Sequence, residues 1–181
     1  MASVHRLVAI LRERSVRVGA FTLSSGATSD LYVDARQTTL NAEGAALVAE
    51  LVLARLRPEV VGVGGMTLGA DPIACAASAW SIAKLGRPVH AFLIRKEAKA
   101  HGAGQRVEGL ASLPRGSRVC VVEDTTTTGK SLLAAVDAAR EAGLDVVQCV
   151  TVVDRLEGAA EAVRAAGLTL EALTTRAELI A

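Results

Sequence analysis

The stretch "VCVVEDTTTTGKSLL", from Val119 to Leu133, changes from apolar to acidic to hydroxylated side chains. Its four apolar residues are typical of a strand buried on both faces, and the carboxylates of Glu123 and Asp124 end that strand. Four threonines and Gly129 then suit a turn, after which a helix is expected to begin near Lys130. The order of strand, polar turn and helix predicts one unit of an α/β fold, in which ligands bind outside the carboxyl ends of the strands.

The residues Gly129, Lys130 and Ser131 also match the end of a nucleotide-binding P-loop, G-x-x-x-x-G-K-[S/T]. The first glycine of that motif would fall on Asp124, whose carboxylate would stand where the loop must wrap around phosphates. This mismatch argues against a nucleoside triphosphatase. A helix N-terminus with nearby threonine hydroxyls suits a phosphate, whereas carboxylates suit sugar hydroxyls, so the pattern indicates a ribose 5-phosphate group. Ordinary helix capping by the same residue types is the alternative.

The rest of the chain repeats the order of strand and helix around this unit. The predicted fold class is α/β, with a central, mostly parallel sheet flanked by helices. The expected strands are 60–65, 88–95, 118–124, 146–154 and 168–174, and the expected helices are 4–15, 41–56, 71–85, 130–142 and 159–166. Asn41 is the expected N-cap of its helix, and the alternating segment 20–36 predicts a hairpin outside the main sheet.

Composition and charge narrow the class of protein. The length of 181 residues suits a single domain, 1–181, and 51% hydrophobic with 22% charged residues is a globular composition. The net charge of +1 argues against a nucleic-acid partner. No apolar run reaches the roughly 18 residues that span a bilayer, and the charged N-terminal segment lacks a signal-peptide core. We therefore expect a cytoplasmic protein without a membrane partner, whose three cysteines are buried thiols.

A long polar segment, 96–115, separates two predicted strands, and a loop of this length is usually functional or mobile. The run "RKEAKAHG" at its start gathers Arg95, Lys96, Lys99 and His101. A solvated, charged loop is one interpretation. Beside a phosphate site, however, these cations would stabilise a polyanionic leaving group, and the glycines that follow would let the loop open and close.

The segment "VCVVEDTTTTGKS" resembles the phosphoribosyl-pyrophosphate (PRPP) motif of the type I phosphoribosyltransferases, which has four apolar residues, two acids and a Thr/Gly-rich loop. The resemblance implies the fold of that family, with a small N-terminal hood contributed mainly by 16–40 and a flexible catalytic loop at 96–115. It implies that Glu123 and Asp124 hold the ribose 2′- and 3′-hydroxyls, and that Asp124 is catalytic. The residues that it implies for the 5′-phosphate are Thr125, Thr126, Thr127, Thr128, Gly129, Lys130 and Ser131, with no role assigned to the Lys130 side chain.

Further segments are similar to those members of the family that act on orotate. "RKEAKAHG" matches their R-K-x-x-K-x-H-G loop, and "FTLSSGATSDLYVDAR" is similar to the hood that covers orotate. "GGMTLGADPIA" stands where the family has its pyrophosphate loop, and "VVDRLEG" matches the strand end whose arginine binds the orotate carboxylate. The resemblance implies transfer of the 5-phosphoribosyl group from PRPP to orotate in pyrimidine (UMP) biosynthesis, giving orotidine 5′-monophosphate and pyrophosphate.

The same similarity assigns roles to individual residues. Lys99 and His101 would reach the pyrophosphate and aid catalysis. The other residues implied to bind PRPP are Arg95, Lys96, Thr67 and Leu68, and those implied to bind orotate are Thr127, Arg155, Tyr32 and Val33. Mg²⁺ would be the cofactor, held mainly by PRPP and water rather than by protein ligands. A homodimer is also implied, in which loop residues 95–101 act in the neighbouring subunit's site.

Two positions depart from the family pattern. Many members carry a lysine where this chain has Ser24, and another where it has Leu68. Charge balance at the pyrophosphate then depends on the loop cations and Mg²⁺, and whether Arg36 compensates from the hood is a question for the structure. Two alternatives are open: a purine phosphoribosyltransferase, which should lack the orotate-type loop and Arg155, and a PRPP-sensing regulator, which would keep the motif without the chemistry.

Overall fold

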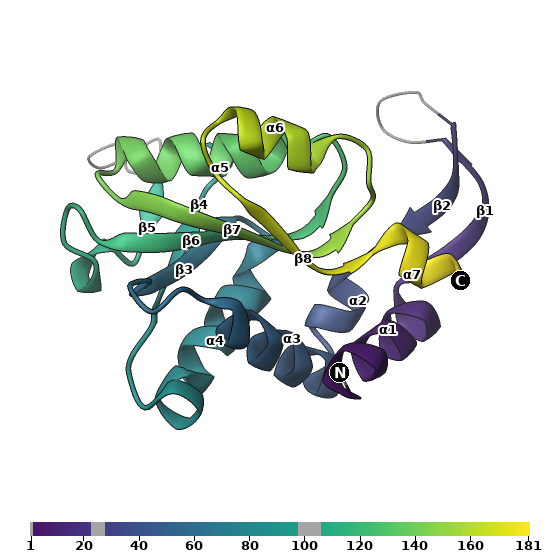
Figure 1. Cartoon of the computed structure of the whole chain (residues 1–181), viewed down its shortest axis with the longest axis horizontal. Coiled ribbons are helices and arrows are strands. Elements are labelled where there is room, and N and C mark those ends of the chain that lie inside the picture. Colours follow the sequence, from purple (N-terminus) through teal and green to yellow (C-terminus); the bar gives the residue numbers. More distant parts are fainter. Residues whose placement is uncertain (1, 23–27, 98–105) are drawn as a thin grey trace.

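A six-stranded sheet forms the centre of the chain in the computed structural model (Figure 1), which describes residues 2–22, 28–97 and 106–181. The strand order is β5-β4-β3-β6-β7-β8, and neighbouring strands are parallel except for the edge strand β5, which is antiparallel to β4. The strands are β3 (Gly62–Met66), β4 (His90–Ile94), β5 (Val107–Glu108), β6 (Arg118–Thr126), β7 (Asp145–Asp154) and β8 (Leu170–Thr175). The predicted α/β fold with a mostly parallel sheet is confirmed.

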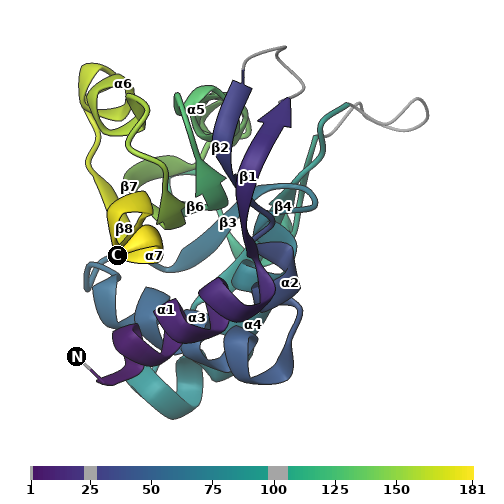
Figure 2. The ribbon, with the colours of Figure 1, turned by 90° about the vertical axis from the view of Figure 1, so that its right-hand side faces the viewer.

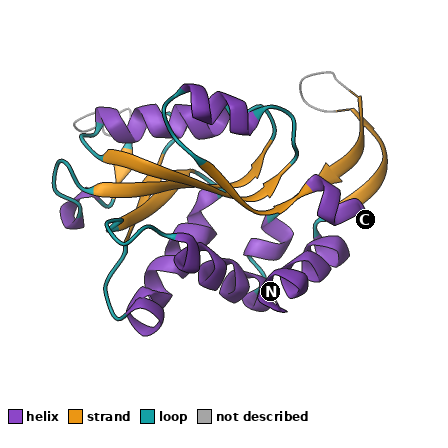
Figure 3. Ribbon diagram, viewed as in Figure 1, coloured by secondary structure: helices purple, strands orange, loops and turns teal. Residues whose placement is uncertain are grey.

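Helices cover both faces of this sheet (Figure 3). One face carries α5 and α6, and the opposite face carries α1, α2, α3 and α4 (Figure 1). The helices are α1 (Ala2–Arg14), α2 (Arg36–Thr39), α3 (Ala42–Arg55), α4 (Ala70–Leu85), α5 (Lys130–Glu141), α6 (Ala159–Ala165) and α7 (Arg176–Ile180). The short helices α2 and α7 were not predicted, because one turn of helix is too short to produce a recognisable hydrophobic period.

Two hydrophobic cores lie on opposite faces of the sheet. Val122 belongs to the core that contains Val52 of α3, whereas its neighbour Val121 belongs to the core that contains Leu132 of α5. Successive side chains of a strand point to opposite faces, so a strand that is covered on both sides needs apolar residues at every position. The continuous apolar run of β6 is explained by this double burial.

The predicted hairpin forms a separate two-stranded sheet, β1 (Val16–Thr22) paired antiparallel with β2 (Thr28–Val33). Figure 2 shows it standing at one end of the central sheet, above α1. Two hydrogen bonds from the Arg12 side chain of α1, to the carbonyls of Glu178 (2.6 Å) and Leu179 (3.1 Å), join the first helix of the chain to its last. The hairpin therefore stands next to a region in which the first and last helices of the chain are packed together.

Asn41 caps α3 as expected, because its side-chain oxygen accepts hydrogen bonds from the backbone N–H groups of Glu43 and Gly44, both at 3.1 Å. The segment 96–115 differs from the prediction of one long loop. Val107 of β5 pairs with Ile94 of β4, and a 3₁₀ turn follows at Leu110–Ser112. A two-residue strand has no periodicity, so the sequence gives no signal for it.

The expectation that all three cysteines are buried is wrong for Cys75, which lies on the exposed side of α4. Cys120 and Cys149 are buried, as predicted. Burial raises the pKa of both thiols, that of Cys149 to about 12. The error arose because α4 is alanine-rich over its whole circumference, so its sequence does not mark the face that packs on the sheet.

Candidate active site

Two adjoining cavities open where β3, β6 and the hairpin come together. The threonine cavity, about 540 Å³, lies along the turn from β6 into α5, and the carboxylate cavity, about 290 Å³, lies between that turn and the end of β2. Both are lined by Met66, Lys96, Glu123, Thr125 and Ser131. The threonine cavity adds Arg106, Thr126, Thr127, Thr128, Gly129, Lys130, Leu132 and Ala134, and the carboxylate cavity adds Tyr32, Val33, Asp34, Arg36, Thr67, Leu68, Gly69 and Asp124.

The threonine turn is fixed on both sides by its backbone. Thr126 is the last residue of β6, and its carbonyl accepts from the Arg155 N–H at 2.9 Å. The Thr127 carbonyl accepts from the N–H of Ala159, at the start of α6, at 3.1 Å. Gly129 has φ of +79°, a conformation that glycine adopts without strain, and it turns the chain into α5. The first N–H groups of α5 lack partners within the helix, so this turn offers a phosphate-binding end with a favourable dipole.

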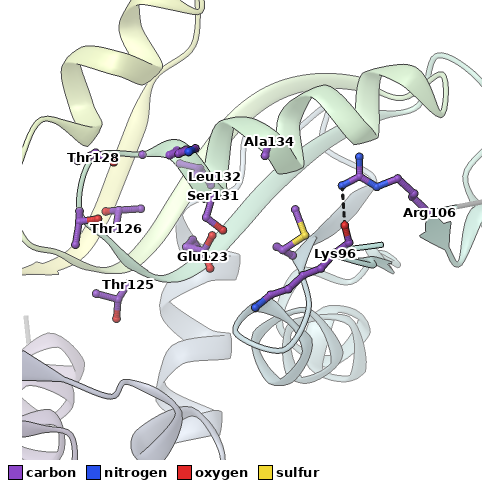
Figure 4. A pocket seen from close by; sticks show the side chains of 13 residues that line it. Lys96, Arg106, Glu123, Thr125, Thr126, Thr128, Ser131, Leu132 and Ala134 are labelled. Atoms are coloured by element: carbon purple, nitrogen blue, oxygen red, sulfur yellow. Dashed lines mark hydrogen bonds between the residues drawn. The ribbon is translucent and has the colours of Figure 1, made fainter. Parts of the chain in front are cut away.

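Figure 4 shows how the threonine cavity is enclosed. Lys96 extends from the opposite wall toward Glu123, and Arg106 lies beside it, with its Nη2 atom 3.5 Å from the Lys96 carbonyl. The Thr125 hydroxyl is buried without a hydrogen-bond partner in the described part of the chain. A buried hydroxyl of this kind is expected to contact a polar ligand.

The two carboxylates lie at the junction of the cavities. Glu123 is only 6% exposed, and its Oε2 atom has no hydrogen-bond partner among the residues described. Burial, followed by the charge of Asp124, raises the pKa of Glu123 to about 7, although a hydrogen bond with Ser131 acts to lower it. Burial likewise raises the pKa of Asp124, against the opposing effect of a hydrogen bond from the Thr125 N–H (2.8 Å). A buried acid beside a half-buried one is unfavourable unless a ligand compensates their charges.

The turn that leads into α4 packs directly against this pair. A Cβ atom at Gly69 would lie 2.7 Å from the Asp124 Oδ1 atom, so any side chain there would displace the carboxylate. Thr67 and Leu68, just before it, line the carboxylate cavity and are joined by a cis peptide bond. The backbone of this turn therefore forms the wall opposite the hood.

The structure brings together most of the residues that the sequence analysis singled out. Glu123 and Asp124 share the cavities with the predicted phosphate turn, with Thr67 and Leu68, and with Tyr32 and Val33. Within the turn, Thr126 is buried and its hydroxyl lies 3.5 Å from the Asp154 carboxylate, whereas Lys130 is exposed.

Of the predicted site residues that the structure describes, two line neither cavity. Arg95 pairs with Glu108 at 2.9 Å, and Arg155, 6% exposed, pairs with Glu157 at 2.9 Å. Their predicted contacts with PRPP and orotate stay predictions. Lys99 and His101, and with them the departure at Ser24, lie outside the described residues.

Sequence reasoning missed Arg106 and Gly69 and gave no role to the Asp34–Arg36 pair. Arg106 reaches the threonine cavity because β5 pairs with β4, and its only sequence signal was a cation in the middle of the polar segment. The Asp34–Arg36 pair, which follows β2, could have been found from its D-x-R spacing, because that spacing places opposite charges two positions apart.

Within the described ranges, no group of three or more His, Cys, Asp or Glu side chains is placed to hold a metal ion. No described helix is both long and apolar enough to cross a membrane.

Comparison with known proteins agrees with this geometry. The family described as "Phosphoribosyl transferase domain" matches residues 69–166, and the chain belongs to that family. Orotate phosphoribosyltransferase of Sorangium cellulosum is 47% identical over 97% of this chain and 92% of its own length. Within the family, the chain belongs to the orotate phosphoribosyltransferases.

Solved structures of orotate phosphoribosyltransferase from Mycobacterium tuberculosis H37Rv are also similar. The complex with Fe(III) dicitrate superposes with a TM-score of 0.83 at 45% identity, covering 98% of both chains. The complex with 5-phospho-α-D-ribosyl 1-diphosphate (PRPP) gives a TM-score of 0.79 at 41% identity, covering 99% of both chains. The fold of this chain is thus that of a type I phosphoribosyltransferase.

Replacement of Glu123 by glutamine is expected to stabilise the protein at high pH. The folded-state pKa of about 7 lies above the ordinary value of 4.5, so folding favours the protonated acid, and stability is lost as pH rises from about 4.5 to about 7. Glu123→Gln should therefore raise the free energy of unfolding at pH 8 by up to about 3 kcal/mol, and by much less at pH 5. Urea unfolding at both pH values measures the difference.

The matched control is Glu141→Gln, which removes a carboxylate from an exposed position of α5. An equal gain for Glu123→Gln at pH 5 and pH 8 would show that ionisation of Glu123 is not the cause of its effect.

Proposed function

We propose that the two cavities together bind PRPP and orotate and join them into orotidine 5′-monophosphate, with release of pyrophosphate. One observation carries the assignment of residues: Glu123 and Asp124 lie directly beside a threonine turn that opens helix α5. In this proposal the turn 125–131 binds the 5′-phosphate through backbone N–H groups and hydroxyls. The two acids accept hydrogen bonds from the ribose 2′- and 3′-hydroxyls, which compensates their burial.

The reaction requires positioning and charge stabilisation rather than a protein nucleophile. As the bond from the anomeric carbon to the diphosphate breaks, positive charge develops on the ribose ring, and Asp124 is the catalytic carboxylate beside it. The diphosphate lies against Thr67 and Leu68, and the cations Arg95, Lys96, Lys99 and His101 stabilise the charge that develops on it. In this proposal, closure of the polar segment 96–115 excludes water, which would otherwise hydrolyse PRPP.

The orotate end of the site is formed by the hood and by the end of β7. Backbone groups of Tyr32 and Val33 face the pyrimidine edge, and both residues line the carboxylate cavity. Arg155 binds the orotate carboxylate through its planar guanidinium, which requires its side chain to turn from Glu157 toward the cavity. Thr127 contacts both orotate and phosphate.

Mg²⁺ fits the donors present at this site. Glu123 has an unpartnered, buried carboxylate oxygen, and hard cations prefer carboxylate, phosphate and water oxygens. We propose that the ion is held mainly by PRPP and water, with Glu123 and Asp124 near it. When bound, Mg²⁺ neutralises diphosphate charge.

The protein acts, in this proposal, as a cytoplasmic homodimer. The segment 95–101 of one subunit reaches the active site of the other, so each site combines residues of two chains. The support is the resemblance of the "RKEAKAHG" segment to the loop of related enzymes. Within its own chain, Arg95 lines neither cavity, whereas Lys96 lines both.

The proposed reaction predicts consumption of orotate only in the presence of PRPP and Mg²⁺. The loss of orotate absorbance, followed with each component omitted in turn, measures it. Conversion of adenine or hypoxanthine without any loss of orotate would contradict the assignment and indicate a purine enzyme. Binding of PRPP without turnover of any base would indicate a PRPP-sensing regulator.

Lys99→Ala should reduce kcat roughly 100-fold, as loss of one charge-stabilising donor does in other active sites, while the affinity for PRPP changes much less. Steady-state kinetics and PRPP titration separate the two effects. Lys84→Ala, which removes an exposed lysine of α4 that pairs with Glu50, is the control. An unchanged kcat in Lys99→Ala would remove this segment from catalysis.

Sharing of sites between subunits predicts complementation. Lys99→Ala and Asp124→Asn are each expected to be nearly inactive, but a heterodimer of the two has about one intact site per dimer, because both defects fall in the same site. Co-expression with two affinity tags isolates the heterodimer for assay. As a control, the heterodimer of wild type with the double variant should have no intact site. If the first heterodimer is inactive and the second is half-active, the segment acts within its own chain.

A further inference from the structure

The segment that joins the hood to α2 places an arginine at the mouth of the carboxylate cavity. Ala35 is completely buried and fixes the segment, while the residues on either side of it, Asp34 and Arg36, both line the cavity. The Arg36 Nε atom donates to Asp34 Oδ1 at 2.9 Å, and Gln37 donates to the other oxygen of Asp34 at 3.2 Å. Arg36 is thus held beside the cavity by a carboxylate that is itself oriented.

Arg36 supplies positive charge to a cavity in which the lining acids outnumber the cations. Three acids line it, Asp34, Glu123 and Asp124, and among the described lining residues the cations are Arg36 and Lys96. The hydrogen bond and charge of Asp34 raise the pKa of Arg36, and the charge of Asp124 raises it further. Burial acts to raise the pKa of Asp34, but the hydrogen bonds from Arg36 and Gln37 outweigh it. Arg36 is therefore close enough to Asp124 of β6, as well as to its own partner Asp34, for both charges to act on it.

The wall opposite Arg36 has no cation to bind an anion. It consists of Thr67, Leu68 and Gly69, and the Leu68 side chain is exposed (69%) and apolar. A diphosphate lying on this backbone, next to two carboxylates, requires a positive group on the facing side. The planar guanidinium suits this role, because its fork of donors matches two phosphate oxygens at once.

We infer that Arg36 binds the diphosphate group of PRPP, and of released pyrophosphate, from the hood side of the cavity, in place of a cation at position 68. This inference rests on the proposed function. In the ligand-free protein Asp34 holds the guanidinium near this position, and binding transfers part of its hydrogen bonding from Asp34 to phosphate oxygens. Arg36 is then a substrate-binding residue that contacts the diphosphate leaving group and not the ribose 5-phosphate moiety.

The test compares Arg36→Gln and Arg36→Lys with the control Arg6→Gln. Arg6 is also an exposed arginine paired with a carboxylate, Glu43, at 2.6 Å, but it lies on α1 and lines neither cavity. Calorimetric titration with inorganic pyrophosphate and Mg²⁺ measures the diphosphate contact, and titration with ribose 5-phosphate measures the rest of the site. Thermal unfolding of each variant verifies that it is folded.

Arg36→Gln should weaken pyrophosphate binding by about tenfold or more, the usual effect of losing a hydrogen bond to a charged group, while ribose 5-phosphate binds as before. Arg36→Lys should be intermediate, because a lysine keeps the charge without the fork. Unchanged pyrophosphate affinity in a folded Arg36→Gln protein would overturn the inference, as would an increase confined to the KM for orotate. If the wild type does not convert orotate, the proposed function fails, but the pyrophosphate titration still decides the role of Arg36.

Discussion

Two neighbouring carboxylates near the end of strand β6, one buried and one half-buried, are the constraint on which the rest of this site depends. Glu123 and Asp124 follow the apolar part of β6, which is covered on both faces, so they have limited access to water and repel each other. The raised pKa of Glu123 is the measure of this unfavourable arrangement. A fold that only needed to be stable would place other residues there, and the arrangement is explained by a ligand whose hydroxyls and counter-charges compensate the acids.

The surroundings of this pair follow from the same constraint. Gly69 has no side chain because Asp124 occupies the space, which lets the turn before α4 approach the end of β6. Asp124 accepts the Thr125 N–H, which begins the threonine turn, and Ser131 at the start of α5 bonds to Glu123. The two acids, the threonine turn and the turn before α4 are thus one connected structure. A displacement of the Asp124 carboxylate would disturb all three.

The β6–α5 unit could be predicted from sequence because its features are local. The apolar run, the two acids and the glycine before the helix each have a fixed conformational meaning, and the parallel sheet follows from their repetition. Arg106 could not be predicted as a cavity residue, because its position depends on the two-residue pairing of β5 with β4. Arg155 shows a second limit: its place at the end of β7 was predictable, but its burial and its pairing with Glu157 depend on side-chain packing. Cys75 shows a third, since an alanine-rich helix does not reveal its buried face.

The two ends of the site differ in how firmly they are held. The threonine turn is fixed by backbone hydrogen bonds to β7 and α6 and by the first turn of a twelve-residue helix. The hood side consists of a two-stranded sheet and a four-residue helix. Its cation, Arg36, is held by a partly exposed ion pair, which contributes less to stability than the backbone contacts and can rearrange. In the proposed reaction the 5′-phosphate stays in place while the diphosphate leaves. The group that stays is bound by a turn that backbone hydrogen bonds hold rigidly. The group that departs is bound by a side chain that can rearrange, so each end of the site suits the group that it binds.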